Sequence, residues 1–216
     1  MIFALLPVKS PRNAKQRLSG FLTAEQREAL ARAMYREMLQ TLCSVRGLDR
    51  VVVVTADDQI ADQARSSGVE VFFETEQHSH SRSADAAAQR AIEMGAASVL
   101  MVPIDVPLVK REEIEALIDA GGPGVVVVPS GDGTGTNALV RNPPDAIRAC
   151  FGPGSFRKHC DQAEARGIPL KVMRPAGILF DIDTPEDVAE LLERAPESRI
   201  ARLLREQTAG LTAPLP

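Results

Sequence analysis

The 216-residue sequence is poor in aromatic residues and in cysteines. It has no Trp, and aromatic residues make up only 4% of the chain, so it lacks the stacking side chains on which single-stranded nucleic acids bind. A net charge of −4 gives no bulk attraction to nucleic acids either. The three cysteines have no metal-ligand spacing, and we expect reduced thiols in a cytoplasmic protein.

Long hydrophobic runs are also missing. The first apolar run, at 2–6, is stopped by Pro7, which makes it too short for a signal peptide or a membrane span. We therefore expect no membrane partner, and we interpret this run as a buried first strand.

Segments typical of strands alternate with helical segments along the chain. The sequence predicts strands at 2–6, 50–55, 69–73, 98–102, 125–128, 137–140, 170–173 and 178–182. It predicts helices between them at 23–45, 57–66, 83–94 and 110–120. Continuous Val, Ile and Leu runs indicate strands buried on both faces, and hence an α/β fold with a mostly parallel sheet flanked by helices. We expect one domain at 1–195, followed by an accessory helix and a frayed tail at 196–216.

Two acidic residues, Asp181 and Asp183, lie one residue apart just before a helix that Thr184 would cap. In a strand they would point to the same face, and their mutual repulsion is most easily offset by a bound cation. Asp105 follows another apolar strand, although a lone Asp there is more typical of a turn. As a set, the three carboxylates predict a site for two divalent ions that clamp the reacting phosphates.

The loop after the first strand, residues 7–17, is basic and contains no glycine. It is therefore neither a Walker A loop nor a dinucleotide-binding loop. If it holds phosphates, it must use the side-chain charges of residues such as Lys9, Lys15 and Arg17. On the loop alone, an ordinary solvated basic loop is an equally good interpretation.

Two further loops are rich in glycine and small residues. Residues 129–137 predict a hairpin, and Thr136 and free backbone N–H groups there could hold an anion. Residues 151–159 open a helix, with Ser155 as the expected N-cap, and a helix N-terminus of this kind is suited to anions.

The three histidines are not predicted to be catalytic. His159, one turn into the helix that follows Ser155, is expected to pack or to cap. His78 and His80 are expected in an exposed loop, because no metal-binding cysteines accompany them.

Together these motifs resemble the guanylyltransferases that make the phospho-acid–guanosine diphosphate intermediate of coenzyme F-420. The resemblance covers nearly the whole domain, in family order, through residues 7–9, 14–18, 105–107, 135–139, 151–156 and 181–187. It implies a single-domain nucleotidyltransferase fold, GT-A-like and Rossmann-like, related to the molybdopterin guanylyltransferases.

The resemblance also implies a reaction and its residues. GMP would pass from GTP to the phosphate of 2-phospho-L-lactate, phosphoenolpyruvate or 3-phospho-D-glycerate, with release of pyrophosphate. Two Mg²⁺ ions would be held by Asp105, Asp181 and Asp183. The nucleotide phosphates would be bound, and the charge on the leaving pyrophosphate neutralised, by Lys9, Lys15 and Arg17. The acceptor would be bound by Thr136, Gly152 and Ser155.

One segment departs from the family pattern. Members usually carry a Gly-Leu-Asn-Ala-Ala-like segment that helps to seat the nucleotide, whereas residues 83–87 here place Asp85 at the Asn position. Compared with Asn, Asp85 lacks two amide donor hydrogens and adds a negative charge. We expect Asp85 to contact the nucleotide, but the preference for guanine stays open.

The expected partners are GTP and a small phospho-carboxylic acid, with a homodimer and hand-over to a downstream transferase as further hypotheses. The Arg- and Ala-rich composition hints at a GC-rich bacterium and favours phosphoenolpyruvate or 3-phospho-D-glycerate. Two alternatives stay open: a relative acting on molybdopterin or a sugar phosphate, and a non-catalytic homologue that binds nucleotide or a partner protein. The chain lacks the glycine-rich, Arg-containing loop that is typical of the first alternative. The three acids and the cations of the first loop argue against the second.

Overall fold

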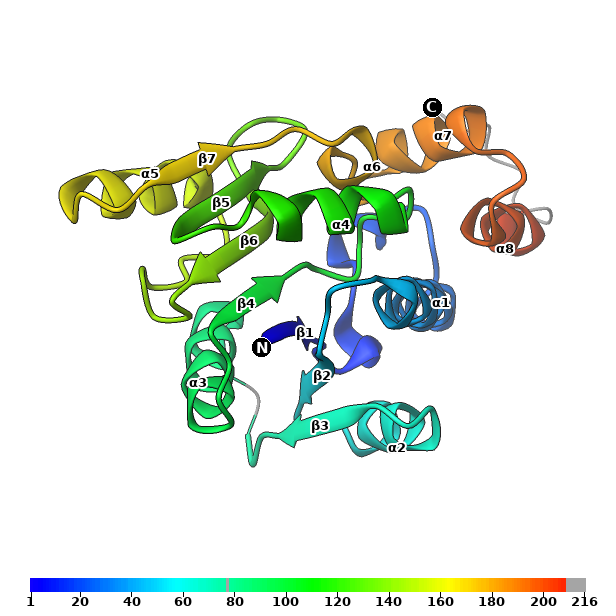
Figure 1. Ribbon diagram of the computed structural model, residues 1–216. Helices are drawn as coiled ribbons and strands as arrows, with labels where there is room; N and C mark the ends of the chain where they lie inside the picture. Colours follow the sequence, from blue (N-terminus) through cyan, green and yellow to red (C-terminus); the bar gives the residue numbers. More distant parts are fainter. Residues whose placement is uncertain (77, 209–216) are drawn as a thin grey trace.

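The computed structural model describes residues 1–76 and 78–208, so the end of the predicted tail, 209–216, lies outside the described residues. One seven-stranded sheet, of order β3-β2-β1-β4-β6-β5-β7, forms the centre of this part of the chain (Figure 1). Its strands are β1 (Ile2–Pro7), β2 (Arg50–Thr55), β3 (Glu70–Phe73), β4 (Ser98–Met101), β5 (Gly124–Pro129), β6 (Thr136–Asn142) and β7 (Leu170–Val172). Only β6 among them runs antiparallel to its neighbours, which confirms the mostly parallel sheet.

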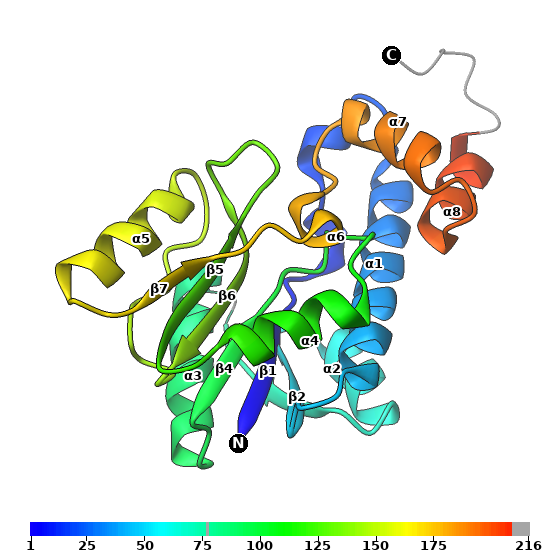
Figure 2. The ribbon, with the colours of Figure 1, turned by 45° about the horizontal axis from the view of Figure 1, so that its top comes forward.

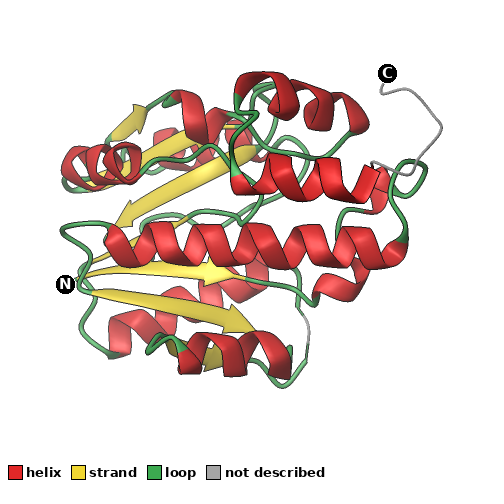
Figure 3. Cartoon of the chain, turned by 90° about the vertical axis from the view of Figure 1, so that its right-hand side faces the viewer, coloured by secondary structure: helices red, strands yellow, loops and turns green. Residues whose placement is uncertain are grey.

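Helices cover both faces of the sheet (Figure 2). They are α1 (Ala24–Ser44), α2 (Asp58–Ser66), α3 (His80–Glu93), α4 (Arg111–Ala120), α5 (Ser155–Ala165), α6 (Ala176–Leu179), α7 (Pro185–Arg194) and α8 (Arg199–Thr208). Successive residues of β1 are buried on opposite faces. Phe3 and Leu5 pack in the core under α3 and α5, and Ala4 and Leu6 pack in the core under α1, α2 and α4. Figure 3 shows the second of these faces, with the long α1 in front of the strands.

A third apolar cluster joins α1, α7 and α8 beside the sheet. Ile200 and Leu204 of α8 are fully buried there, with Met34 of α1 and Val188 of α7. The predicted accessory helix is thus present and is packed against the body of the domain. No helix among the described residues is long and apolar enough to cross a membrane.

The predicted strand at 178–182 is wrong. Residues 176–179 form the short helix α6, in which the N–H groups of Ile178 and Leu179 both donate to the carbonyl of Pro175. Ile178 is buried and its carbonyl accepts a hydrogen bond from Asn137 Nδ2. A short apolar run is compatible with either a helix or a strand, and tertiary contacts decide between them.

The starts of α3 and α5 differ from the prediction in the residue that caps them. α3 begins at His80 rather than Ser83, because Ser79 caps it by accepting the Arg82 N–H. α5 is capped by Gly154, with φ of 70°, so the predicted N-cap, Ser155, is its first helical residue instead. The glycine takes the left-handed conformation without the cost that a side chain would add.

The strand order reverses between the neighbours β1 and β4. In open α/β sheets, ligands bind at such a point, in the crevice beyond the carboxyl ends of the strands. The loops that follow β1 and β4 carry Lys15 and Asp105, respectively.

Candidate functional site

A large cavity of about 1190 Å³ opens at this edge of the sheet. Its walls come from the loop after β1, the loop after β4, the β5–β6 turn, the segment before α5, and residues between α6 and α7. Its volume exceeds the usual range for a site that holds one small molecule, about 300–1,000 Å³. The cavity therefore has room for two substrates side by side.

Lys15 is the centre of the charged side of the cavity. Its Nζ donates to Asp105 Oδ2 at 2.7 Å, to the carbonyl of Ile182 at 2.6 Å and to Asp183 Oδ1 at 3.0 Å. These three contacts use all three hydrogens of the ammonium group. The Lys15 side chain is only 7% exposed, and its φ of 51° and ψ of 45° place the backbone in the left-handed region. The loop after β1 is thus tied to the segment that precedes α7.

The ion pairs keep Lys15 and Asp105 charged. Burial by itself lowers the pKa of Lys15, but the charges of Asp105 and Asp183 outweigh it and raise that pKa above the usual 10.5. Burial likewise acts to raise the pKa of Asp105, but the Lys15 ammonium outweighs it and holds that pKa below the ordinary value. Both groups therefore carry their charges at neutral pH.

Of the three acids, Asp181 is the one whose negative charge is not paired with a cation among the described residues. Asn137 Nδ2 donates to its Oδ1 at 2.9 Å, and the other oxygen has no hydrogen-bond partner within residues 1–76 and 78–208. Burial raises the pKa of Asp181, and the negative charges of Asp105 and Asp183 raise it further. A cation beside Asp181 would reverse that shift.

The structure brings the three predicted acids to one wall of the cavity. Among the described residues, no group of three Asp, Glu, His or Cys side chains is close enough together to hold one metal ion. Lys15 lies between Asp105 and Asp183 and binds both. The chemistry of the donor set nevertheless fits a hard divalent cation, because all its ligand atoms are carboxylate oxygens and Asp181 has one unpartnered. The two Mg²⁺ ions stay a prediction.

The other predicted cations also line the cavity. Arg17 is 69% exposed and its Nη1 lies 3.2 Å from Asp183 Oδ2. Lys9 is exposed, and none of the ion pairs among the described residues involves it. Two exposed positive charges therefore line the cavity, beside the buried charge of Lys15.

In the β5–β6 turn and the segment before α5, Thr136 and Gly152 line the cavity, whereas Ser155 does not. Ser155 is completely buried and donates to Thr136 Oγ1 at 3.0 Å, so it lies behind Thr136. The lining residues of this side, in 130–137 and 151–153, include no Lys or Arg. An anion bound here would depend on neutral donors.

Asp85 is not brought to the cavity. Its Oδ1 accepts from Arg141 Nη1 at 2.8 Å and from the Ala149 N–H at 3.0 Å, and it is absent from the lining residues. Arg141 is only 1% exposed, so the carboxylate partners a buried cation of β6. Asp85 is therefore left out of the nucleotide contacts proposed below.

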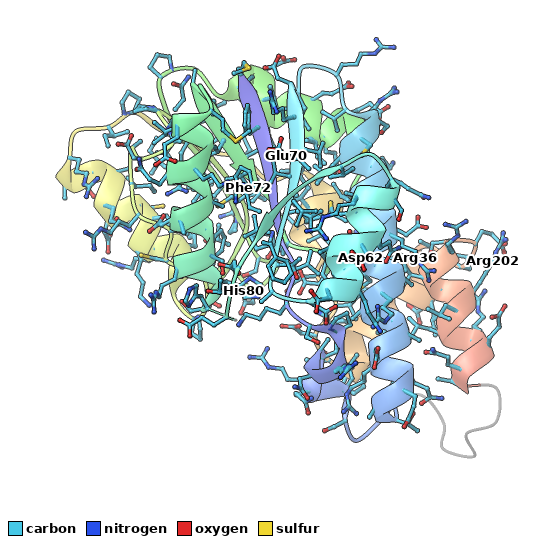
Figure 4. All side chains as sticks on the ribbon, turned by 90° about the horizontal axis from the view of Figure 1, so that it is seen from below. Arg36, Asp62, Glu70, Phe72, His80 and Arg202 are labelled. Atoms are coloured by element: carbon cyan, nitrogen blue, oxygen red, sulfur yellow. The ribbon has the colours of Figure 1, made fainter. Side chains whose placement is uncertain are left out.

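Sequence reasoning missed two residues of the site. His80, expected in a loop, is the first residue of α3 and lines the cavity (Figure 4). Ser79 was the available signal, because it is a good N-cap residue just before it. Asn137 holds both Asp181 and the carbonyl of Ile178, and nothing in the sequence predicts that long-range contact.

Comparison with known proteins gives consistent matches. The family model described as "Guanylyl transferase CofC like" matches residues 2–208. A phosphoenolpyruvate guanylyltransferase of Rubrobacter xylanophilus is 36% identical over 192 residues, which cover 88% of this chain and 93% of that protein. A 2-phospho-L-lactate guanylyltransferase of Methanothermobacter thermautotrophicus is 30% identical over 94% of this chain and 89% of its own length.

Solved structures agree on the fold. A nucleotidyl transferase from Methanothermobacter thermautotrophicus superposes with a TM-score of 0.65 at 14% identity, over 95% of this chain and 99% of the other. A 4-diphosphocytidyl-2C-methyl-D-erythritol synthase from Anaerococcus prevotii gives 0.63 at 12% identity, over 95% and 96% of the two chains. The α/β nucleotidyltransferase fold is thereby confirmed.

Proposed function

The chain belongs to the CofC-like guanylyl transferase family, and we propose that it transfers GMP from GTP to the phosphate of a small phospho-carboxylic acid in coenzyme F-420 biosynthesis. An oxygen of the acceptor phosphate attacks the α-phosphorus of GTP, the bond to the β-phosphate breaks, and pyrophosphate leaves. The observation that carries the proposal is the single cavity with a cationic side, three carboxylates, and a side without cations.

The cationic side suits the triphosphate. Lys9 and Arg17 are exposed, line the cavity and would bind the β- and γ-phosphates, with Arg17 as a fork and Lys9 as a point charge. Lys15 would add a fixed positive charge where the leaving pyrophosphate gains negative charge. No side chain needs to act as a nucleophile, since the acceptor phosphate is already ionised at neutral pH, and catalysis rests on positioning.

The carboxylates suit a divalent ion. Asp105, Asp181 and Asp183 are the residues that would hold Mg²⁺, which when bound supplies charge neutralisation at the reacting phosphates. Asn137 keeps Asp181 turned toward the cavity from its place in β6.

The side without cations suits the acceptor. Thr136 and the backbone at Gly152 would donate to its carboxylate or phosphate oxygens. Relatives at 36% and 30% identity are named for phosphoenolpyruvate and for 2-phospho-L-lactate, in both of which the phosphate sits on the carbon next to the carboxylate. We propose phosphoenolpyruvate as the preferred acceptor.

One assay tests this function: purified protein, GTP and Mg²⁺ with each of the three phospho-acids, following pyrophosphate release and the mass of the product. We expect the fastest release with phosphoenolpyruvate. Asp181→Asn should lower the rate by at least about a hundredfold, because it removes a charge from the phosphate-facing set. Asp62→Asn, a 75% exposed carboxylate of α2, is the matched control and should leave the rate unchanged (Figure 4). Absence of pyrophosphate with all three acids would disprove the proposal.

A further inference from the structure

His159, in α5 beneath the acceptor side of the cavity, has a fixed proton position. It is completely buried, and its Nε2 accepts the backbone N–H of Cys150 at 2.9 Å. Burial, aided by the charge of Arg141, lowers its pKa to about 4, so the ring is neutral and carries one N–H at physiological pH. Because Nε2 is an acceptor, that proton is on Nδ1, which lies 3.0 Å from Thr136 Oγ1 and donates to it.

Thr136 receives a second hydrogen bond from the same side. Ser155 Oγ lies 3.0 Å away and donates to the same Thr136 oxygen. A hydroxyl has two acceptor positions and one hydrogen of its own. Since His159 and Ser155 fill both acceptor positions, the Thr136 hydrogen is left for the cavity, which Thr136 lines.

The other side-chain donors of this side are already engaged: the hydroxyls of Ser130 and Thr134 donate to Asp132, and Asn137 Nδ2 donates to Asp181 and to the carbonyl of Ile178. The lining residues within 130–137 and 151–153 include no Lys or Arg, and two of the first N–H groups of α5 are already taken. Ser155 N donates to the carbonyl of Gly152, and Phe156 N donates to the carbonyl of Thr134. The hydrogen bond from an oriented Thr136 hydroxyl therefore contributes more to binding of the acceptor here than it would beside a basic side chain.

We infer that His159 is a positioning residue for the acceptor: it fixes the Thr136 hydroxyl as a hydrogen-bond donor to an anionic oxygen of the phospho-acid. The inference rests on the proposed function and assigns the recognition of the acceptor, as distinct from that of GTP, to the chain Cys150 N–H, His159, Thr136. His159 itself touches no substrate.

Two substitutions separate the contributions of the two ring nitrogens of His159. In His159→Asn the amide nitrogen can take the place of Nδ1 and donate to Thr136, whereas in His159→Gln the longer side chain offers an oxygen at the Nε2 position, to Cys150. We expect His159→Gln to raise the KM for phosphoenolpyruvate about tenfold, which is the loss of one hydrogen bond to a charged group. His159→Asn should stay within about twofold of wild type. The KM for GTP should not change in either variant.

Thr136→Val removes the hydroxyl at nearly constant shape and should raise the acceptor KM at least as much as His159→Gln. The double variant should be no worse than Thr136→Val, because His159 acts through Thr136. Additive effects, or equal increases in both KM values, would overturn the inference. If the histidine variants do not fold, the comparison of Thr136→Ser with Thr136→Val decides: equal acceptor KM values for those two would also overturn it.

Calorimetric titration with phosphoenolpyruvate, without GTP, keeps this inference separate from the proposed function. If the wild type turns over phosphoenolpyruvate and His159→Gln has the same acceptor KM, the proposed function is supported and the positioning role is overturned. If the wild type binds phosphoenolpyruvate without turning it over, and both His159→Gln and Thr136→Val weaken that binding, the second at least as much as the first, the proposed function is overturned and the positioning role is supported. An absence of wild-type binding and turnover overturns both.

Discussion

At the scale of single residues, Lys15 combines two unfavourable features that the surrounding site must outweigh. Its left-handed backbone costs about 1 kcal/mol or more for a residue with a side chain, and its ammonium group is taken out of water. Three hydrogen bonds, two of them to carboxylates, offset these costs. The same contacts hold Asp105 and Asp183 together across the cavity wall, so Lys15 has a structural role in addition to any role toward phosphate.

Lys15→Met should destabilise the protein by about 2 kcal/mol, because it leaves Asp105, whose side chain is only 26% exposed, without its cation. The loss should be smaller than for a fully buried pair, since Asp183 is 38% exposed. Urea unfolding at pH 7 measures the difference. Lys9→Met, which removes an exposed cation from the same loop, is the control and should change the free energy of unfolding by less than about 0.5 kcal/mol. Equal stabilities of the two variants would contradict the structural role of Lys15.

His159 should make stability depend on pH. Its pKa is about 4 in the folded protein against 6.5 in the unfolded chain, so the unfolded state binds more protons between these values. Its contribution is therefore complete above pH 6.5 and is lost as the pH falls toward 4, by up to about 3 kcal/mol. Other groups titrate in the same range, so the measurement is the difference from His159→Gln in urea midpoints between pH 7 and pH 4. Parallel curves would show that the ring is not held neutral.

The sequence predicted the kinds of residue in the site better than their partners. It predicted three acids and three cations at one edge of the sheet, and the structure brings Asp105, Asp183 and Lys15 into contact there. It did not predict that Lys15 is buried while Lys9 is exposed, or that Ser155 lies behind Thr136. Such differences arise from contacts between residues 19 to 168 positions apart, to which local patterns do not respond.

At the scale of elements, the start of α7 holds the acidic segment in place. Asp187 Oδ2 accepts the N–H groups of Asp183 at 2.8 Å and Thr184 at 2.7 Å, and Thr184 Oγ1 accepts the Asp187 N–H. The sequence predicted Thr184 as the cap of this helix, and the structure completes the capping box with the hydrogen bonds that Asp187 accepts. The strand expected before it was not found, since a run as short as 178–182 has no periodicity that separates a helix from a strand.

Asp187→Ala should therefore cost about 1–2 kcal/mol of stability and lower the rate of pyrophosphate release several-fold, because it frees the backbone of Asp183. Thermal unfolding and the turnover assay measure the two effects. Glu186→Ala is the matched control: it removes a neighbouring first-turn acid that accepts none of these bonds and is exposed. If both variants lose the same rate, the orientation of Asp183 does not depend on Asp187.

At the scale of the whole molecule, the sheet and its two helical layers were predictable, whereas the third apolar cluster was not. Val-rich strands flanked by capped helices indicate a parallel α/β sheet directly. The burial of α8 against α1 depends on a few apolar residues in a strongly polar segment, Ile200, Ala201 and Leu204 among them. So few apolar residues do not reveal from the sequence which part of the domain they pack against.

A chain ended at Ala195 should be destabilised by about 4–6 kcal/mol, because Ile200 and Leu204 lose their burial and uncover apolar residues of α1 and α7. That is a large share of the stability of a typical domain, about 5–15 kcal/mol. Urea unfolding measures the loss. A chain ended at Thr208 keeps α8 and is the control, and the same loss in both would mean that α8 contributes nothing.

The contacts of Lys15 also set an order of events during synthesis. Lys15 meets Asp105 across 90 positions and Asp183 across 168, so its last partners are synthesised long after Lys15 itself. Until then, β1, β2, β3 and β4 can pair while the ammonium group has only Asp105 to bind. The nascent chain can thus pair four of its seven strands before residues 181–183 have been made, and the acidic wall of the cavity forms only after them.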